Sequence, residues 1–472
     1  MVSPLFTLQS DRVALRFGDR ALTHAELAAC AGTLARQLAG SPRVAIWATP
    51  TIETCVAVVA ALLAGVPAVP LNPKVGEREL AHIVADSAPA SVLAAPGVAL
   101  PAGLDSVPRR DVTLDGDPVE LPAEPGPEAP ALIVYTSGTT GSPKGVVLPR
   151  RAILSTLDSV AEAWEWTADD VLVHALPLFH VHGLILGVLG PLRLAGTLHH
   201  LGKFSTDQVT RALDADGTMM FGVPTMYHRI AEEVGGDAEL AAALKQARLL
   251  VSGSAALPVR DHERIAAATG QRVVERYGMT ETLMNTSVRA SGDRRPGAVG
   301  LPLPGVEVRL VDDHGAVLDE TGAVGEIQVR GQNLFTEYLN RPDATAEAFA
   351  DGWFRTGDVG TRDDDGYYRI VGRKATDIIK SGGYKIGAGE IENALLEHPA
   401  VKEVAVTGEP DDDLGERIVA WVVPSGDAPD AGELSDHVAR LLTPHKRPRR
   451  VRFVESLPRN DMGKVMKRAL GT

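Results

Sequence analysis

The chain has 472 residues, of which 44% are hydrophobic and 23% are charged. This length predicts at least two domains, and the composition excludes a generally disordered protein. The formal net charge of −14 argues against a nucleic-acid partner, because contacts to phosphate backbones need surplus Lys and Arg. Small anionic substrates stay compatible with this charge, since a local cationic site matters more to them than the total.

The amino terminus and the cysteines favour a soluble protein of a reducing compartment. The segment MVSPLFTLQSDRVALRF has no basic stretch followed by an apolar run, so we expect no secretory signal. The longest apolar stretch is interrupted by Gly65 and Pro67 and is too short to span a bilayer. Cys30 and Cys55 lie in no motif and are expected to be apolar fillers. We therefore expect a cytoplasmic protein without membrane contact.

The first part of the chain alternates between strand-like and helix-like patterns. Residues 43–47 (RVAIW) predict a buried strand, residues 51–65 (TIETCVAVVAALLAG) a helix, and residues 66–71 (VPAVPL) another strand. This alternation predicts parallel βαβ units. Eight prolines between residues 96 and 130 predict a surface connection, and residues 131–135 (ALIVY) predict the strand that follows it.

Beyond residue 300 the pattern changes to strands and turns, and the last hundred residues predict a separate small α+β unit. Segments VKEVAVTG and ERIVAWVVP predict strands, and ELSDHVARLL predicts an amphipathic helix with Leu434, Val438 and Leu441 on one face. The predicted fold is therefore α/β, with a large multi-subdomain unit of βαβ layers over residues 1–373. A small, mobile α+β unit is predicted over residues 374–472, with a hinge at about residues 373–376.

The predicted strand at residues 131–135 runs into the motif YTSGTTGSPKG at residues 135–145. Successive backbone N–H groups of a glycine-rich loop form an anion-binding concavity, and hydroxyls and a lysine add donors suited to polyphosphate. A Walker-type P-loop is excluded, because Lys144 is followed by Gly145 and Val146, and Pro143 lies where a helix would begin. A plain surface turn is the alternative for this motif taken alone.

Further motifs follow in a fixed order: LPLFHVHGL (176–184), SGSAALP (252–258), ERYGMTE (275–281), RPGAVG (295–300), GEIQVRG (325–331), GWFRTGD (352–358), GYYRIVGR (366–373), IIKSGGYKIGAGEIE (378–392) and PRNDMGKVMK (458–467). From about residue 10 to the carboxyl terminus, this set resembles the adenylate-forming superfamily of acyl-CoA synthetases, adenylation domains and luciferases. The resemblance implies two steps. A carboxylate attacks the α-phosphate of ATP to give acyl-AMP and pyrophosphate, and a thiol then displaces AMP.

The resemblance also implies roles for individual residues. It assigns catalysis to Lys464, Thr280, Glu281 and His180. It assigns Mg²⁺ to Glu281 with Thr136, as hard oxygen ligands for a hard cation. The nucleotide would be held by Thr136, Ser137, Gly138, Thr139, Thr140, Gly141, Lys144, Ser254, Ala255, Glu275, Tyr277, Gly278, Met279, Asp358 and Arg373.

Coenzyme A would be the second co-substrate beside ATP. Its pantetheine would pass along a loop containing Gly382, Gly383, Tyr384 and Lys385, which the resemblance brings to the site by a swing of the small unit. Lys464 would reach the α-phosphate only in the closed arrangement. Small molecules are the only partners implied, and no obligate protein partner is evident.

Arg276 carries the prediction of the acid substrate. Many relatives have a small residue at this position, whereas an arginine shortens the pocket and adds a permanent charge with bidentate geometry. A second carboxylate on the substrate is the natural partner of such a charge, with His182 as a further ligand. The segments ERYGMTET and FHVHG resemble the superfamily members that activate malonate or methylmalonate. We therefore expect ATP-dependent ligation of a short dicarboxylic acid to CoA.

Three alternatives remain open at this point. Arg276 could pair with Glu275 and merely shorten the pocket for a short monocarboxylic acid. A stand-alone adenylation protein could load a carrier protein, although the segment with His180 and His182 lacks the acid that binds an amino group in amino-acid-activating relatives. A catalytically dead relative is the third, but every expected charged residue is present.

Overall fold

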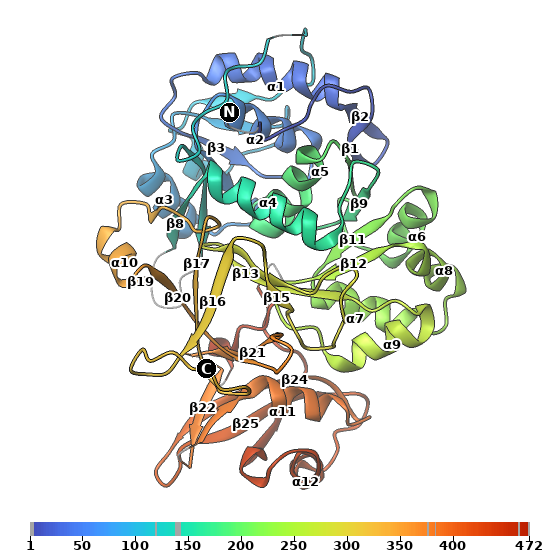
Figure 1. Cartoon of the computed structure of the whole chain (residues 1–472). Coiled ribbons are helices and arrows are strands. Elements are labelled where there is room, and N and C mark those ends of the chain that lie inside the picture. Colours follow the sequence, from blue (N-terminus) through green and yellow to red (C-terminus); the bar gives the residue numbers. More distant parts are fainter. Residues whose placement is uncertain are drawn as a thin grey trace.

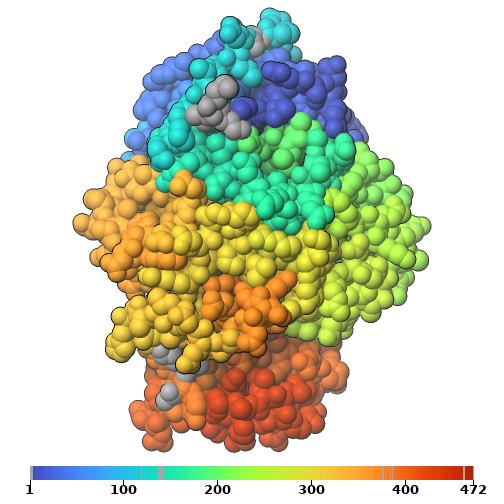
Figure 2. All heavy atoms as spheres, viewed as in Figure 1, coloured from blue at the N-terminus to red at the C-terminus, as the bar shows by residue number. Residues whose placement is uncertain are grey.

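The computed structural model describes residues 4–118, 120–136, 143–374, 377–382, 384–460 and 463–470. Most of the chain forms a large domain, and the carboxyl-terminal part forms a lobe of its own beneath it (Figures 1 and 2). Within the described ranges no helix combines the length and apolarity needed to cross a bilayer. Cys30 and Cys55 are buried and free, as predicted.

The first sheet of the large domain follows the predicted βαβ pattern and then departs from it. Strands β4, β3, β5 and β6 are parallel to one another and to β7, whereas β8 and β18 are antiparallel to their neighbours. The spatial order is β18 (Glu337–Tyr338), β8 (Lys144–Pro149), β7 (Pro130–Thr136), β4 (Ala68–Leu71), β3 (Val44–Trp47), β5 (Val92–Ala94), β6 (Arg109–Asp111).

The second sheet carries most of the strands whose ends form the site. Its central strands are parallel, and its edges β13–β14–β15 and β1–β2 are antiparallel. The order is β15 (Leu301–Pro302), β14 (Leu283–Ser287), β13 (Val274–Met279), β12 (Leu249–Ser252), β11 (Met219–Gly222), β9 (Val171–His174), β10 (Thr197–His200), β1 (Val13–Phe17), β2 (Arg20–Thr23).

The helices cover these sheets in two layers. Helix α2 is buried on every side, which explains its uniformly apolar sequence, and it shares one core with both sheets. That core also contains α1, which begins at the capping box of Thr23 and Glu26, and the π-helix η2. The helices of this layer are α1 (His24–Leu38), α2 (Ile52–Leu63), α4 (Arg150–Trp164), η2 (His182–Leu189) and α5 (Gly190–Arg193).

A second core lies on the other face of the second sheet, under helices further along the chain (Figure 1). These are α6 (Thr206–Ala215), α7 (Pro224–Glu233), α8 (Ala238–Gln246) and α9 (Val259–Thr269). Helix α3 (Glu77–Ser87) and the short helix η1 (Ala102–Leu104) lie beside the first sheet.

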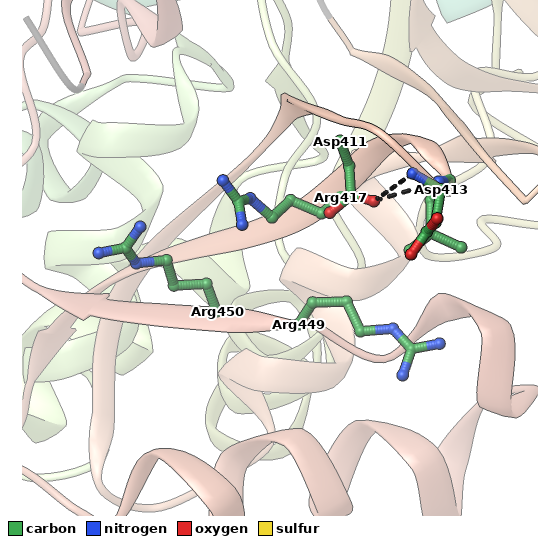
Figure 3. A pocket seen from close by; sticks show the side chains of 6 residues that line it. Asp411, Asp413, Arg417, Arg449 and Arg450 are labelled. Atoms are coloured by element: carbon green, nitrogen blue, oxygen red, sulfur yellow. Dashed lines mark hydrogen bonds between the residues drawn. The ribbon is translucent and has the colours of Figure 1, made fainter.

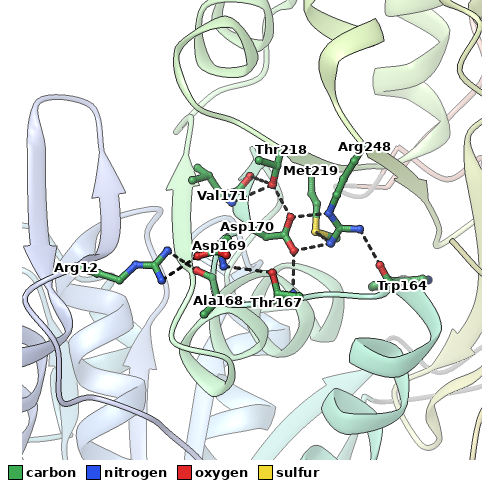
Figure 4. Close-up of polar contacts among 10 residues, drawn as sticks. All are labelled: Arg12, Trp164, Thr167, Ala168, Asp169, Asp170, Val171, Thr218, Met219 and Arg248. Atoms are coloured by element: carbon green, nitrogen blue, oxygen red, sulfur yellow. Dashed lines mark hydrogen bonds and ion pairs between the residues drawn. The ribbon is translucent and has the colours of Figure 1, made fainter.

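The carboxylate of Asp170 connects the amino ends of strands β9, β11 and β12 in the second sheet. Asp170 precedes β9 and accepts hydrogen bonds from Thr218 before β11 (2.7 Å) and from Arg248 Nε before β12 (2.6 Å), as Figure 4 shows. Arg248 Nη1 also donates to the carbonyl of Trp164 at 2.8 Å. Burial by itself raises the pKa of Asp170, but the bonds from Arg248 and its neighbours bring the pKa below its ordinary value. The candidate site lies at the opposite, carboxyl ends of the strands, where open α/β sheets bind ligands.

A third sheet connects the large domain to the lobe. It contains β16 (Val306–Val311), β17 (Gly325–Gly331), β19 (Phe349–Ala350), β20 (Trp353–Arg362) and β21 (Tyr368–Arg373), with α10 (Pro342–Glu347) alongside. Strand β21 belongs to this sheet and β22 (Ile378–Ser381) belongs to the lobe. The hinge at residues 373–376 stays a prediction, since residues 375 and 376 lie outside the described ranges.

The lobe is the predicted α+β unit, confirmed in its elements. Its sheet contains β22, β23 (Tyr384–Gly387), β24 (Val401–Asp411), β25 (Gly415–Pro424) and β26 (Arg450–Phe453). Helices α11 (Ala388–Leu396) and α12 (Ala431–Leu441) share its core, with the short helices η3 (Pro444–Lys446) and η4 (Lys467–Ala469) nearby.

The structure refines two expectations from the sequence. Leu434 and Val438 of α12 are buried, whereas Leu441, the last residue of the helix, is 47% exposed. The proline-rich segment 96–130 lies largely at the surface, as predicted, but it also forms β6 and buries Leu104 and Val112. Prolines limit which strands form but do not prevent such packing.

Candidate active site

The site residues lie around the carboxyl ends of strands from both sheets of the large domain. Strand β7 ends at Thr136, β12 ends just before Gly253, and β13 carries residues 274–279 into the turn that holds Thr280. A loop at a strand's carboxyl end places side chains where open α/β sheets bind ligands. The third sheet adds Asp358 from β20.

The glycine-rich motif bridges β7 and β8, which form an antiparallel pair with Thr136 opposite Lys144. A strand and not a helix begins at Lys144, so the exclusion of a P-loop is confirmed. The predicted phosphate ligands Ser137, Gly138, Thr139, Thr140 and Gly141 lie outside the described residues.

Lys144 and Glu281 are joined through a tyrosine that the sequence analysis missed. The Lys144 ammonium lies 3.9 Å from the ring centroid of Tyr338, and the Tyr338 hydroxyl donates to Glu281 Oε1 at 2.9 Å. Glu281 is only 7% exposed. Tyr338 comes from β18, which pairs with β8, so only the sheet order brings it there.

Tyr277, Asp358 and Arg373 form a second buried group. The Tyr277 hydroxyl donates to Asp358 Oδ2 at 2.6 Å, and Arg373 Nε lies 2.8 Å from Asp358 Oδ1. Burial raises the pKa of Asp358, while the charges of Arg373 and Lys464 oppose that rise. Residues that the sequence placed on the adenosine are therefore assembled, and their contacts with a nucleotide stay predictions.

Lys464 reaches the site from the lobe. Its side chain is exposed, and its charge acts on both Asp358 and Asp377. The adjacent Gly463, with φ +74°, lies so close to α7 that a Cβ there would be 2.7 Å from Thr225 Oγ1. The lobe is thus docked with Lys464 turned toward the large domain.

Arg276 is buried beside the loop 252–258. Its side chain belongs to a residue only 6% exposed, and among the described residues its Nε and Nη2 have no hydrogen-bond partner. Burial lowers the pKa of Arg276 to about 10, so the group stays charged at neutral pH. A Cβ at Gly253 would lie 2.3 Å from the guanidinium carbon, so only glycine leaves room for this side chain.

Glu275 does not neutralise its neighbour. Its carboxylate accepts from the N–H of Leu257 at 3.1 Å and of Gly297 at 2.9 Å, and His262 Nε2 lies 2.9 Å away. Successive side chains of a strand point to opposite faces, which separates Glu275 from Arg276. The predicted role of Glu275 at the nucleotide is untested, but its carboxylate is held by protein groups and connects the loop 252–258 to the loop 295–300.

The histidine segment forms the beginning of the π-helix η2. His182 is 2% exposed, its Nδ1 lies 3.4 Å from Ser254 Oγ, and its Nε2 has no partner in the described part of the chain. Burial, followed by the charge of Arg276, holds the pKa of His182 well below its ordinary value, so the ring is neutral. His180 lies two residues before η2 and is half-buried.

Other predicted residues lie on the surrounding loops. Ser254 has φ +74°, a strained conformation of the kind found at functional sites, and both it and Ala255 are exposed. Gly278, Met279 and Thr280 are half-buried. Their nucleotide and catalytic roles are not tested by this geometry.

The predicted CoA loop is a hairpin between β22 and β23. Gly382 has φ +57° and donates its N–H to Leu414 O at 2.9 Å, and the exposed Tyr384 ring stacks on His445 at 4.1 Å. Gly383 and the side chain of Lys385 lie outside the described part of the chain. This hairpin and Lys464 belong to different segments of the lobe.

Comparison with known proteins identifies the class to which this fold and site belong. A large α/β domain with a small α+β lobe is the architecture of adenylate-forming enzymes, which are among the structural neighbours. Residues 7–339 match the family of AMP-binding enzymes, and residues 390–464 match the AMP-binding enzyme C-terminal domain. The chain belongs to the AMP-binding enzyme family, and the predicted superfamily and fold class are confirmed.

Three relatives are especially informative. The mitochondrial malonate–CoA ligase of Mus musculus is 37% identical, with 91% of this chain and 81% of the relative covered. A malonyl-CoA ligase ternary product complex with methylmalonyl-CoA and AMP is 65% identical, with 97% and 100% covered and a TM-score of 0.76. ATP-bound MatB from Rhodopseudomonas palustris is 35% identical, with 98% and 95% covered and a TM-score of 0.90.

Proposed function

We propose that the protein ligates malonate or methylmalonate to coenzyme A through an acyl-adenylate, with release of AMP and pyrophosphate. The observation that carries the proposal is the buried guanidinium of Arg276, for which the described residues supply no acid partner. A buried charge without a partner is costly, so a ligand anion is the group that would balance it. The relatives named for malonate and methylmalonate support the same substrates.

Arg276 and His182 are a matched pair of proposed donors for the distal carboxylate. Arg276 supplies charge and fork geometry, and the neutral ring of His182 supplies an uncharged donor through Nε2. His180, at the start of the same helix, is the proposed neighbour of the reacting carboxylate. A monocarboxylic acid would leave Arg276 unpaired, which disfavours that alternative.

The nucleotide would lie between the two buried groups described above. Asp358 and Arg373 are the proposed ribose ligands, Tyr277 the adenine contact, and Thr280 the donor to the α-phosphate. Lys464 would add positive charge where negative charge builds in the transition state. Its exposed position beside Asp358 leaves the ammonium available for that purpose.

Magnesium fits the residues that the site provides. No cluster of three or more His, Cys, Asp or Glu side chains suited to a metal occurs in the described ranges, whereas Glu281 offers a nearly buried carboxylate. Mg²⁺ is commonly held by one or two carboxylates together with phosphate oxygens. We propose Glu281 and Thr136 as its protein ligands, with the ion neutralising charge on the phosphates.

The CoA site is proposed to extend from the Gly382 hairpin along the lobe. Leu414, whose carbonyl accepts the Gly382 N–H, borders a hollow of about 570 Å³ (Figure 3). The hollow is also lined by three arginines and two aspartates: Arg417, Arg449, Arg450, Asp411 and Asp413. Arginines are well suited to phosphate groups. The chain superposes better on the ATP-bound relative than on the CoA-thioester product complex, which supports a lobe arrangement set for adenylation.

The test compares acids in a pyrophosphate-release assay. Wild-type protein is expected to prefer malonate and methylmalonate over acetate and propionate, and to form the CoA thioester. Arg276→Ala is expected to reduce kcat/KM for malonate by about 100-fold or more, because a buried charge pair is lost, with little loss for propionate. Arg211→Ala, at an exposed position on α6, is the matched control and should change neither.

Two results would contradict the proposal. Equal losses on malonate and propionate would show that Arg276 does not recognise the distal carboxylate. Release of pyrophosphate with an amino acid, without thioester formation from CoA, would instead favour an adenylation protein that loads a carrier.

A further inference from the structure

Arg260 of helix α9 reaches from the large domain onto the lobe. Its Nη1 donates to the carbonyls of Leu396 (3.0 Å) and Val401 (3.2 Å), and its Nη2 donates to the carbonyl of Lys402 at 3.4 Å. The side chain is 20% exposed, so these contacts are largely shielded from water. Arg260 lies outside the groups assigned to ATP, acid and CoA.

The accepting carbonyls lie at the end of one element of the lobe and the beginning of the next. Leu396 is the last residue of α11, and Val401 and Lys402 begin β24. The last carbonyls of a helix have no partner within the helix, and a cation there also interacts favourably with the helix dipole. One guanidinium thus holds a helix end and a strand beginning of the lobe together.

Polar contacts connect the beginning of β24 with the segment that contains Lys464. Glu403, next to Lys402, pairs with Arg459 Nη2 at 2.5 Å, and Arg459 Nη1 donates to the carbonyl of Gly463 at 2.7 Å. Gly463 immediately precedes Lys464 and lies against Thr225 of α7. The lobe residues that Arg260 contacts are therefore connected to the segment that contains Lys464.

We propose that Arg260 is a positioning residue that holds the lobe in the arrangement in which Lys464 serves adenylation. It acts through Lys464 and touches no substrate. The same contacts would have to break when the lobe moves to present the Gly382 hairpin, so Arg260 favours the first half-reaction over the second. The inference rests on the two-step chemistry of the proposed function but not on the identity of the acid.

The experiment separates the two half-reactions in Arg260→Ala. ATP–pyrophosphate exchange, with acid and without CoA, measures adenylation, while thioester formation from supplied acyl-adenylate and CoA measures the second step. Exchange is expected to fall about 10-fold, because hydrogen bonds from a charged donor are lost, with the second step unchanged or faster. Arg264→Ala, one turn along α9 and exposed, is the control and should leave both steps unchanged.

Two further variants keep the test decisive. Arg260→Lys keeps the charge but has no fork to span several carbonyls, so its exchange rate should lie between those of wild type and Arg260→Ala, and a fully folded Lys variant rules out misfolding as the cause. In a Lys464→Ala background, Arg260→Ala should cost nothing more in residual exchange. An equal loss in both half-reactions, no loss in exchange, or an undiminished loss in the Lys464→Ala background would overturn the proposal.

The acid is chosen so that this inference fails independently of the substrate assignment. Exchange is run with malonate and with propionate, and the faster acid is used for all variants. If propionate proves the faster, the malonate proposal fails while the ratio of the two half-reactions still tests Arg260.

Discussion

Arg150 and Arg276 are both buried arginines of the large domain, 2% and 6% exposed, but they differ in whether an acid pairs with them. Arg150, at the beginning of α4, forms an ion pair with Glu124 and donates to the carbonyl of Leu62 at 3.1 Å. Arg276 has no acid partner among the described residues, and the nearest acid in the sequence, Glu275, is held by other donors. Burial lowers the pKa of each arginine to about 10.

Under the proposed function, this difference separates a structural charge from one that binds substrate. Pairing within the protein offsets the desolvation of Arg150 and ties the segment around Glu124 to two helices. Arg276 keeps its desolvation cost in the free protein, and under the proposed function the distal carboxylate of the substrate would offset that cost on binding. We therefore expect the unpaired buried cation to bind a ligand anion, whereas the paired one stabilises the core.

Exchanging the two arginines for methionine is expected to give the largest contrast. Arg276→Met should abolish the rise in melting temperature that malonate gives the wild-type protein, because only the ligand-bound form gains from that charge. Its stability without ligand should not fall, since an apolar side chain replaces an unpaired buried charge. Thermal unfolding with and without malonate measures both.

Arg150→Met is expected to show the reverse pattern. It should lower the free energy of unfolding by about 2–3 kcal/mol, reduced from a fully buried pair because Glu124 is 24% exposed. The melting-temperature rise caused by malonate should persist. A variant of Arg150 that lost malonate binding, or a variant of Arg276 that lost only stability, would contradict the comparison.

The pair of Asp170 and Arg248 extends the comparison to a half-exposed arginine (Figure 4). Asp170→Asn should cost about 1–2 kcal/mol at neutral pH, since charged hydrogen bonds at the strand beginnings are lost. The pKa of Asp170 is lower in the folded protein than its ordinary 3.8, so its contribution is present above pH 4 and disappears as pH falls through the folded value. Urea unfolding of both proteins at pH 7 and near pH 3 should show the difference shrinking, and a constant difference would refute the assignment.

His182 should give the smallest effect, because it is a neutral donor beside the charged one. His182→Gln is expected to raise KM for malonate about 5-fold, the value of one neutral hydrogen bond, with little change in kcat. Since the pKa of His182 lies well below its ordinary value, protonation of this ring should produce no step in KM between pH 6 and 8. A step in the wild type that disappears in His182→Gln would show that the ring titrates in this range.

Local patterns predicted much of the fold and many of the site residues. The strand at residues 131–135 and the helix at residues 51–65 appear as β7 and α2, because their apolar runs and flanking Gly and Pro act over short distances. The burial of Leu104 and Val112 within segment 96–130 was not predicted, since it depends on surfaces supplied by other parts of the chain. Tyr338 was missed for the same reason, because β18 begins 188 sequence positions after the end of its partner β8.

The sequence by itself determined the superfamily and the presence of an arginine before Tyr277, because those motifs are short segments whose chemistry depends on residue type and spacing. Only the tertiary structure decided that Glu275 turns toward Leu257 and Gly297, that Gly253 leaves room for the guanidinium, and that Arg260 contacts the lobe. The physical reason is that the role of a charged side chain depends on the groups that surround it after folding. Those groups come from strands and loops far apart in the chain, and no local pattern specifies which of them will meet.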